Sequence, residues 1–141
     1  MLKTLKQGDV VTIIGAGISG IGLTKLAKKL GMRVFVSENK KEITYQQHEE
    51  LNELGVEYEL GGHTERAFDC DAILLSSGIS PTSTAVLSAL KKNVPCIGEI
   101  DFISTYLSSK LIGITGSNGK TTTTSLVAHI MNCMGVSCAA S

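Results

Sequence analysis

Two glycine-rich loops constrain this chain most strongly. Residues 15–20 read G-A-G-I-S-G, and residues 115–122 read T-G-S-N-G-K-T-T. Each loop follows an apolar run typical of a strand and precedes a stretch with helical spacing of its apolar residues. A loop in that position presents backbone N–H groups and a helix N-terminus to an anion. Two such loops predict two phosphorylated ligands. They favour an enzyme that uses one nucleotide as its energy source and binds its substrate through a second nucleotide attached to that substrate.

Strand and helix patterns alternate along the chain. The predicted strands are residues 10–14, 33–37, 56–60, 72–75, 94–97 and 111–115, with a further strand beginning at Val136. The predicted helices are residues 18–30, 46–54, 83–92 and 99–107, and a last helix that ends at Gly135. This alternation predicts an α/β fold: a Rossmann-like parallel sheet with flanking helices, followed by the first strand, phosphate loop and helix of another domain.

Chain length limits how much of that second domain is present. A chain of 141 residues with 43% hydrophobic content buries one sizeable core, and a second complete domain does not fit comfortably. No repeat or low-complexity linker marks a boundary, so the motifs place it near residues 108–110. We therefore expect one domain over residues 1–109 and the start of a second over residues 110–141.

Charge and cysteine content exclude several classes of protein. Lysine plus arginine and aspartate plus glutamate number 13 each, so no net field favours nucleic acid or an anionic membrane as a partner. The four cysteines form no C-x-x-C pair, and the first residues lack an apolar segment of signal length, which predicts a reduced, cytoplasmic protein. His129, Cys133 and Cys138 superficially suggest metal ligation, but buried small residues and a surface histidine are the favoured interpretation.

The first loop has the G-x-G-x-x-G pattern of a dinucleotide site. Gly15 allows the tight turn, Gly17 allows close approach of a phosphate, and Gly20 allows close packing of helix on strand. Glu38 lies about twenty residues further on, at a strand end, where a carboxylate bonds a ribose hydroxyl. Asn39 and Lys40 stand beside it and are suited to a base edge as well as a sugar. The alternative is that the glycines only permit a compact corner and that Glu38 is only solvated.

The second loop ends like a P-loop. Backbone amides around Gly116 and Gly119 would wrap phosphates, Lys120 would neutralise the β and γ oxygens, and the Thr121 hydroxyl would ligate Mg²⁺. The strict pattern expects glycine where Ile114 stands, so it fails by one position. The threonines after Thr121 are suited to local hydroxyl bonds in the first helical turn.

The sequence of residues 114–123, I-T-G-S-N-G-K-T-T-T, resembles the variant P-loop of the Mur ligases, the ATP-dependent amide-forming enzymes of peptidoglycan synthesis. The resemblance covers most of the chain. Within the family, residues 15–20, S-S-G-I at 76–79 before Pro81, and G-E-I-D-F at 98–102 are most similar to the branch that adds D-glutamate. Two segments depart from the usual pattern: Ser77 replaces a proline, and residues 38–40 replace an Asp-Thr-Arg-like triplet.

The resemblance implies ATP and Mg²⁺ as cofactors and an acyl-phosphate mechanism that joins D-glutamate to UDP-N-acetylmuramoyl-L-alanine. The implied catalytic residues are Lys120 and Thr121, with Thr121 also holding the metal ion. The implied ATP-binding residues are Gly116, Ser117, Asn118, Gly119, Lys120, Thr121 and Thr122. The implied UDP-substrate residues are Gly15, Gly17, Ile18, Ser19, Gly20, Glu38, Asn39, Lys40, Ser77 and Gly78. The sequence would then be an N-terminal piece with a truncated ATPase domain, inactive alone.

Other interpretations stay open on the residues. A different Mur ligase, such as the one that adds L-alanine, would share both loops. An NAD-binding oxidoreductase or sensor would need only the strands, the first loop and Glu38, although the Gly-Lys-Thr sequence argues against it. A non-catalytic nucleotide-binding module is a third class. In a truncated ATPase domain, we expect the apolar face of residues 111–134 to pack on the first domain or on a second copy of the chain.

Overall fold

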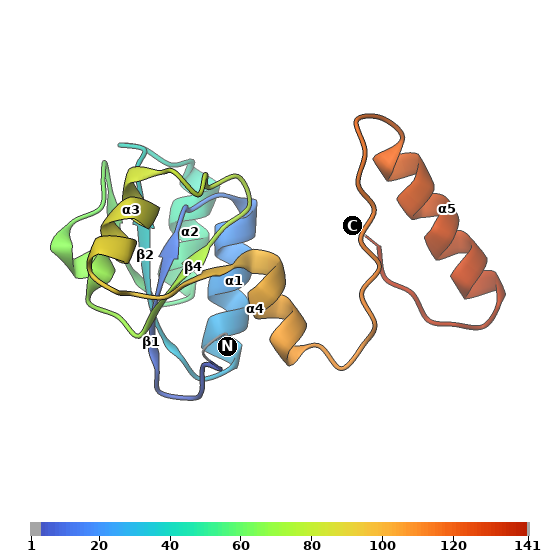
Figure 1. The fold of residues 1–141 in the computed structure, drawn as a ribbon, viewed down its shortest axis with the longest axis horizontal. Coiled ribbons are helices and arrows are strands. Elements are labelled where there is room, and N and C mark those ends of the chain that lie inside the picture. Colours follow the sequence, from blue (N-terminus) through green and yellow to red (C-terminus); the bar gives the residue numbers. More distant parts are fainter. Residues whose placement is uncertain (1–3, 141) are drawn as a thin grey trace. The chain divides into compact units, whose positions relative to one another are not determined.

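The computed structural model describes residues 4–140, which separate into two compact units, one ending at Leu107 and the other beginning at Ser108 (Figure 1). The first unit holds a five-stranded parallel sheet in the order β3-β2-β1-β4-β5. The strands are β1 (Val10–Ile14), β2 (Arg33–Glu38), β3 (Glu57–Leu60), β4 (Ala72–Leu75) and β5 (Cys96–Gly98). The predicted Rossmann-like sheet is confirmed.

The central strand shows why an apolar run becomes a parallel strand. In β1, Val11 pairs with Val34 of β2 on one side and with Ala72 of β4 on the other. Helices cover both faces of the sheet, so residues 11–14 are all buried and β1 shows no polar alternation. Strand β3 has a neighbour on one side only, and its residues are partly or fully exposed, as expected for a sheet edge.

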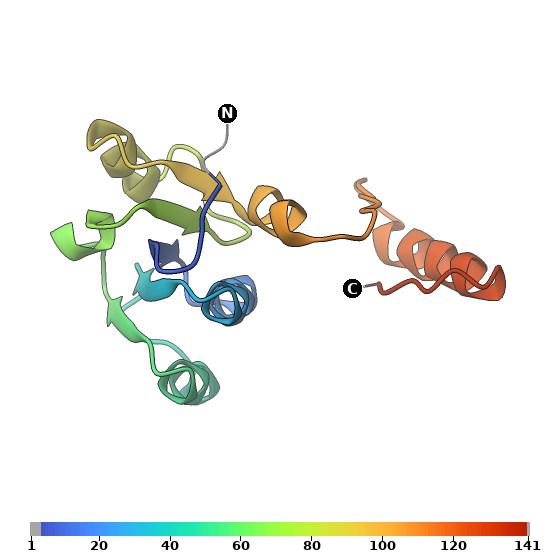
Figure 2. The same cartoon turned by 90° about the horizontal axis from the view of Figure 1, so that it is seen from below.

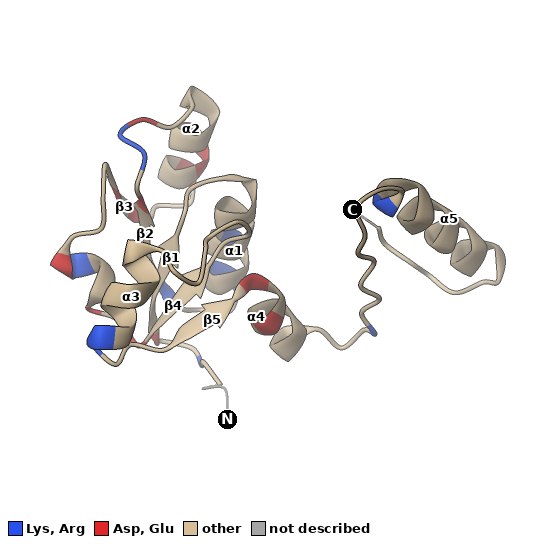
Figure 3. Cartoon of the chain, turned by 45° about the horizontal axis from the view of Figure 1, so that its top comes forward, with Lys and Arg blue, Asp and Glu red and all other residues tan. Residues whose placement is uncertain are grey.

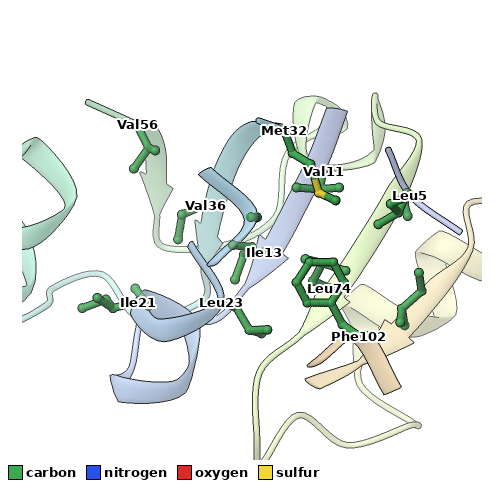
Figure 4. Close-up of a cluster of buried hydrophobic side chains, with 14 of the residues drawn as sticks. Leu5, Val11, Ile13, Ile21, Leu23, Met32, Val36, Val56, Leu74 and Phe102 are labelled. Carbon is green, nitrogen blue, oxygen red and sulfur yellow. The ribbon is translucent and has the colours of Figure 1, made fainter. Parts of the chain in front are cut away.

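Helices lie on both faces of the sheet (Figure 2). The helices α1 (Ile18–Lys29), α2 (Tyr45–Glu53) and α4 (Glu99–Tyr106) contribute to one apolar cluster, and α3 (Thr84–Lys91) with the short 3₁₀ helix η1 (Glu65–Phe68) contributes to the other. Figure 4 shows the larger cluster, in which Ile13 and Leu74 from the sheet lie near Leu23 of α1 and Phe102 of α4. Burial of these side chains supplies the main driving force for folding this unit.

The second unit contains the helix α5 (Lys120–Cys133), which ends before Gly135 as predicted. The strand predicted over residues 111–115 is wrong, and so is the strand predicted from Val136, because both segments are irregular in the structure. A strand forms by pairing its N–H and C=O groups with a neighbour, and the described part of this unit contains no other strand. Within this unit, Leu126 and Ile130 of α5 and Met134 just after it are exposed.

Acidic and basic residues are interspersed along the ribbon of the first unit, in keeping with the balanced charge of the sequence (Figure 3). Between residues 4 and 140, no helix is long and apolar enough to cross a membrane.

Candidate functional site

The carboxyl ends of parallel strands meet at one edge of a sheet, where ligands of this fold class bind. In the first unit this edge carries the glycine loop after β1, residues 38–40 at the end of β2, residues 76–78 after β4 and Glu99 after β5. The topology therefore brings all the segments predicted to hold the UDP substrate to the same edge. We call this edge the carboxyl edge.

Each glycine of the first loop has a different surrounding. Gly15 adopts φ +99°, and a Cβ there would meet Ser76 Oγ at 2.4 Å. A Cβ at Gly20 would meet the carbonyl oxygen of Gly15 at 1.9 Å, so this position requires glycine for helix-to-loop packing. Gly17 has an ordinary φ of −72° and no atom within 4 Å of an added Cβ. The space beside Gly17 is therefore open to a ligand.

The backbone amides of the loop divide into two groups. The Gly15 N–H donates to the Ser37 carbonyl at 2.9 Å, and the Ala16 N–H donates to Glu38 Oε2 at 2.8 Å. After the N-cap Gly17, the amides of Ile18, Ser19 and Gly20 form the first turn of α1, where a helix offers no carbonyl acceptor. No acidic side chain occupies this turn and no side chain caps it. The positive end of α1 is thus available to an anion such as a diphosphate.

Glu38 does more in the structure than the predicted ribose contact. Its Oε1 accepts from the Lys40 N–H at 2.9 Å while its Oε2 accepts from the Ala16 N–H. The carboxylate therefore ties the glycine loop to the end of β2. Each oxygen keeps a second acceptor site, so a sugar or base contact by Glu38 stays a prediction, as do those by the exposed Asn39 and Lys40.

The loop after β4 is held by two residues that the sequence analysis did not select. Glu99, the first residue of α4, accepts from the Ser77 N–H at 3.0 Å and from the Ser77 hydroxyl. The Ser76 hydroxyl donates to the Ile14 carbonyl at 2.8 Å, which joins this loop to the end of β1. Gly78 follows with φ +92°. The G-E-I-D motif contained Glu99, but only the pairing of β4 with β5 places it against Ser77.

A third group missed by the sequence analysis surrounds Ser37 and consists of Ser37, Glu59, His63 and Thr64. The Ser37 hydroxyl lies 2.6 Å from Glu59 Oε1 and 2.7 Å from His63 Nδ1. Burial alone would raise the pKa of Glu59, but hydrogen bonds from Ser37 and Thr64 bring it below its ordinary 4.5. Burial lowers the pKa of His63 below 6.5 despite the nearby carboxylates of Glu59 and Glu38. We call these four residues the Ser37 cluster.

The second loop forms the start of α5 in the other unit. Gly119 precedes the helix in the left-handed conformation with φ +76°, and Lys120 Nζ donates to the Gly116 carbonyl at 2.5 Å. A hollow of about 340 Å³ lies at this helix start, lined by Ile114, Lys120, Thr121, Thr124, Ser125 and Ala140. Unpaired first-turn amides, an ammonium group and a hollow suit a polyphosphate.

The threonines of this loop behave differently from one another. The Thr124 hydroxyl donates to the Lys120 carbonyl at 2.9 Å, so it makes the local helix bond predicted for the later threonines. The exposed Thr121 hydroxyl has no hydrogen bond to any residue in 4–140, which leaves it suited to a magnesium ligand. The predicted ATP residues Ser117, Asn118 and Thr122 are exposed around the same helix start.

The expectation against a metal site at the last helix concerns His129, Cys133 and Cys138. Cys133 Sγ lies 3.6 Å from His129 Nε2, one helical turn away. The described residues contain no group of three or more histidine, cysteine or acidic side chains arranged to hold a metal ion. Cys133 is exposed and Cys138 is half-buried, so the interpretation of these cysteines as buried small residues is wrong, while His129 is exposed as expected.

A cavity of about 460 Å³ in the first unit lies away from these loops. Its lining includes Val10, Arg33 and Glu57, the first residues of β1, β2 and β3, so it opens at the amino ends of the strands. Arg66 from the same lining pairs with Glu57 and lies over the Phe35 ring, 4.4 Å from its centroid. Paired charges and aromatic stacking give this cavity a structural explanation, and we place the ligand site at the carboxyl edge.

Comparison with known proteins gives a family and close relatives. A family profile described as the MurD N-terminal domain matches residues 10–85. The UDP-N-acetylmuramoylalanine–D-glutamate ligase of Christiangramia forsetii is 40% identical over 131 residues, which cover 92% of this chain and 29% of that protein. The enzyme of the same name from Salinibacter ruber is 40% identical over 119 residues, which cover 84% of this chain and 26% of that protein. This chain thus spans less than a third of the length of these two relatives.

Among solved structures, the murein peptide ligase of Psychrobacter arcticus aligns with a TM-score of 0.64 at 24% identity. The alignment covers 91% of this chain and 27% of that protein. At this identity the likeness concerns the fold.

Proposed function

Because the chain belongs to the family of the MurD N-terminal domain, we propose that it is the substrate-binding start of a ligase that joins D-glutamate to UDP-N-acetylmuramoyl-L-alanine. In this proposal residues 1–109, which contain the first unit, hold the UDP part of the substrate. Residues 110–141 supply the start of an ATP-binding domain with its phosphate loop. The observation that carries the proposal is the open helix start at residues 17–20, at the same edge as the loops after β2 and β4.

The first unit would bind the diphosphate through the amides of Ile18, Ser19 and Gly20, with the open side of Gly17 allowing close approach. The uridine would lie toward residues 38–40, where carboxylate, amide and ammonium groups offer both acceptors and donors. Ser77 and Gly78 would border the nucleotide on the β4 side, held in place by Glu99. These assignments support recognition of the substrate and leave the chemical step to the other unit.

In the second unit, the amides at the start of α5 and the Lys120 ammonium would bind ATP phosphates, and the Thr121 hydroxyl would contribute one ligand to Mg²⁺. When bound, the Mg-nucleotide supplies the phosphoryl group that activates the substrate carboxylate. The Lys120 ammonium would stabilise the negative charge of the phosphoryl group during its transfer. This ammonium lies at the loop, where it donates to the Gly116 carbonyl. A cytoplasmic location fits these soluble substrates and belongs to the proposal.

A dinucleotide oxidoreductase is the competing function. The sheet order and the G-x-G-x-x-G loop are common to both classes, so the fold does not separate them. The 40% identical relatives over most of this chain carry ligase names, and the Gly-Lys-Thr ending at residues 119–121 has no place in a dehydrogenase. Both observations favour the ligase.

Titration of the 141-residue chain with UDP-N-acetylmuramoyl-L-alanine, NADH and Mg-ATP in parallel calorimetric experiments tests the proposal. We expect binding of the UDP compound, no binding of NADH, and weak binding of ATP. Binding of NADH with exclusion of the UDP compound would refute the assignment.

The division of labour between the units gives a second test. Lys120→Ala should abolish ligation in a protein extended to the length of the relatives, because charge on the transferring group loses its counter-ion. The affinity for UDP-N-acetylmuramoyl-L-alanine should stay within about twofold of the unchanged protein, since that ligand binds the other unit. A large loss of UDP-compound affinity would contradict the assignment of Lys120 to ATP.

A further inference from the structure

The Ser37 cluster has a defined direction of hydrogen bonding. A serine hydroxyl has one proton, and an ionised carboxylate only accepts. The Ser37 hydroxyl therefore donates to Glu59 Oε1 at 2.6 Å, and His63 Nδ1–H donates to Ser37 Oγ at 2.7 Å. The arrangement selects the ring form with the proton on Nδ1. A longer contact of 3.4 Å from Ser37 Oγ to the Gly62 carbonyl is the weaker alternative for the hydroxyl proton.

Three segments meet in the cluster. Ser37 and Glu59 are register partners on β2 and β3, and His63 and Thr64 come from the turn after β3. Thr64 fixes Glu59 from the other side, with its N–H at 3.0 Å from Oε1 and its hydroxyl at 2.6 Å from Oε2. Ser37 is completely buried, so water cannot replace the hydrogen-bond partners of its hydroxyl. Loss of those partners would leave an unsatisfied polar group at the end of β2 and destabilise it.

The cluster adjoins the glycine loop through the backbone of the same strand end. The Ser37 carbonyl accepts from the Gly15 N–H at 2.9 Å, and the next residue, Glu38, accepts from the Ala16 N–H at 2.8 Å. Two successive residues of β2 thus hold the two first amides of the loop. The position of the loop depends on the position of this strand end, and the Ser37 cluster anchors that end from the side of β3.

We propose that His63 is a positioning residue for the UDP site, which acts through the Ser37 hydroxyl to fix the end of β2 and thereby the shape of the glycine loop. This inference rests on the proposed function of the first unit. His63 lies outside every motif recognised in the sequence. The contribution of His63 is one hydrogen bond from Nδ1–H to Ser37 Oγ. Another side chain that donates to Ser37 Oγ from the same position should therefore fix the end of β2 equally well.

The protonation state of His63 links this role to pH. The charged groups that act on the ring are Glu59 on β3 and Glu38 at the end of β2, and both favour the imidazolium. Burial opposes them and prevails, so the pKa of His63 lies below 6.5 and the ring is neutral at pH 7. Protonation keeps the Nδ1–H donor to Ser37, but it adds an Nε2–H donor that has no acceptor among residues 4–140, and the new positive charge attracts Glu38, the carboxylate that holds the Ala16 N–H. We therefore expect weaker ligand binding as the pH falls through the His63 pKa.

The test measures the affinity of the 141-residue chain for UDP-N-acetylmuramoyl-L-alanine by calorimetry between pH 5 and pH 8. Both phosphates of this probe are esterified, so the second phosphate ionisation near pH 6 of a free phosphomonoester is absent. Amide hydrogen exchange of Gly15 and Ala16 is recorded in parallel without ligand. His63→Ala removes the donor, His63→Gln keeps a donor without titration, and His48→Ala is the matched control, since His48 Nδ1 also bonds a hydroxyl, that of Tyr58, at 2.8 Å.

We expect His63→Ala to weaken binding about tenfold at pH 7.5, the effect of one buried hydrogen bond, and to speed exchange at Gly15 and Ala16. His63→Gln should bind like the unchanged chain at pH 7.5 and lose the fall in affinity at acid pH. His48→Ala should leave affinity and both exchange rates unchanged. If His63→Ala itself fails to fold, the flat pH profile of His63→Gln carries the test.

Unchanged affinity and unchanged Gly15 and Ala16 exchange in His63→Ala would overturn the inference. An acid-pH loss that persists in His63→Gln would overturn it as well. If the unchanged chain binds no UDP compound while His63→Ala still speeds exchange at both amides, the proposed function fails and the positioning role stands. The two hypotheses are therefore separable.

Discussion

At the scale of single residues, the first loop shows that similar glycines serve different purposes. Gly20 is required by the backbone, because its missing Cβ leaves room for the Gly15 carbonyl. Gly17 is not required by any contact within the first unit, and its open side faces the region where an anion would approach α1. A pattern of glycines in a sequence cannot distinguish these two roles, whereas the space around each Cβ does.

We predict that Gly17→Ala lowers the free energy of unfolding by no more than about 1 kcal/mol, because φ is ordinary and the space is open, so that only the preference of the helix N-cap for glycine over alanine is lost. The added methyl group would stand where the diphosphate approaches, so affinity for UDP-N-acetylmuramoyl-L-alanine should fall at least about tenfold. Urea unfolding and calorimetry measure the two quantities. Full affinity in this variant would show that the diphosphate does not bind beside Gly17.

Gly20→Ala should destabilise the first unit by about 3 kcal/mol, because a Cβ 1.9 Å from a backbone oxygen forces α1 away from the loop. Gly22→Ala, on the exposed side of the same helix with no atom within 4 Å, is the matched control. It should stabilise by up to about 1 kcal/mol, since alanine favours the helix over glycine. Equal urea midpoints for the two variants would contradict the packing role of Gly20.

At the scale of helices and strands, most elements could be predicted because their local sequence signals, such as helix caps and apolar periodicity, agree with the way the elements pack in the structure. Helix α2 illustrates a complete local signal: the Thr44 hydroxyl accepts from the Gln47 N–H at 3.3 Å, and the Gln47 side chain accepts from the Thr44 N–H at 2.8 Å. This reciprocal cap sets the first turn of the helix. Leu51, on the same helix, is fully buried and anchors it to the larger cluster.

Thr44→Ala should therefore destabilise the first unit by about 1 kcal/mol, the usual effect of losing a helix cap. Glu49→Ala on the exposed side of α2, where the side chain makes no hydrogen bond to a described residue, should change stability by less than about 0.5 kcal/mol. Urea unfolding followed by circular dichroism compares the two. A Thr44 variant as stable as the Glu49 variant would show that packing of Leu51 alone holds the helix.

The elements that the sequence did not predict correctly lack a local signal or a partner. The 3₁₀ helix η1 spans four residues, too few for a periodic pattern to appear. The run at residues 111–115 has the composition of a strand, but it has no neighbouring strand among residues 108–140 of its unit and so makes no ladder. The composition of a segment indicates that it could form a strand, but the strand forms only when a second strand is present to pair with it.

At the scale of the whole molecule, the candidate sites are split between the units, and their predictability differs for a physical reason. The glycine loops and Lys120 could be proposed from the sequence because each motif consists of residues close together in the chain. Glu99 and His63 were missed because their partners, Ser77 and Ser37, lie more than twenty positions away and meet them only through strand pairing. Residues that hold a site in place are therefore harder to predict than residues that line it.

The Ser37 cluster also predicts how the stability of the first unit depends on pH. The pKa of His63 in the folded state is below 6.5, so near that pH the folded state binds fewer protons than the unfolded state. The contribution of His63 to the free energy of unfolding is therefore fully present above pH 6.5, and it is lost as the pH falls through the pKa of the folded state. Glu59, with a pKa below 4.5, gives a second loss at lower pH. Urea midpoints measured from pH 8 to pH 3 should decline in these two stages. In His63→Gln the first decline should disappear; its persistence would assign it to another group.

The tie between the end of β2 and the first two loop amides has a consequence for how a ligand would associate. A segment whose backbone is already bonded to Ser37 and Glu38 has little conformational freedom left to lose when an anion arrives. The entropic cost of complex formation would then fall mainly on the ligand, and encounter with the loop would need no slow rearrangement of the protein. Recognition at this helix start would be closer to lock-and-key than to induced fit.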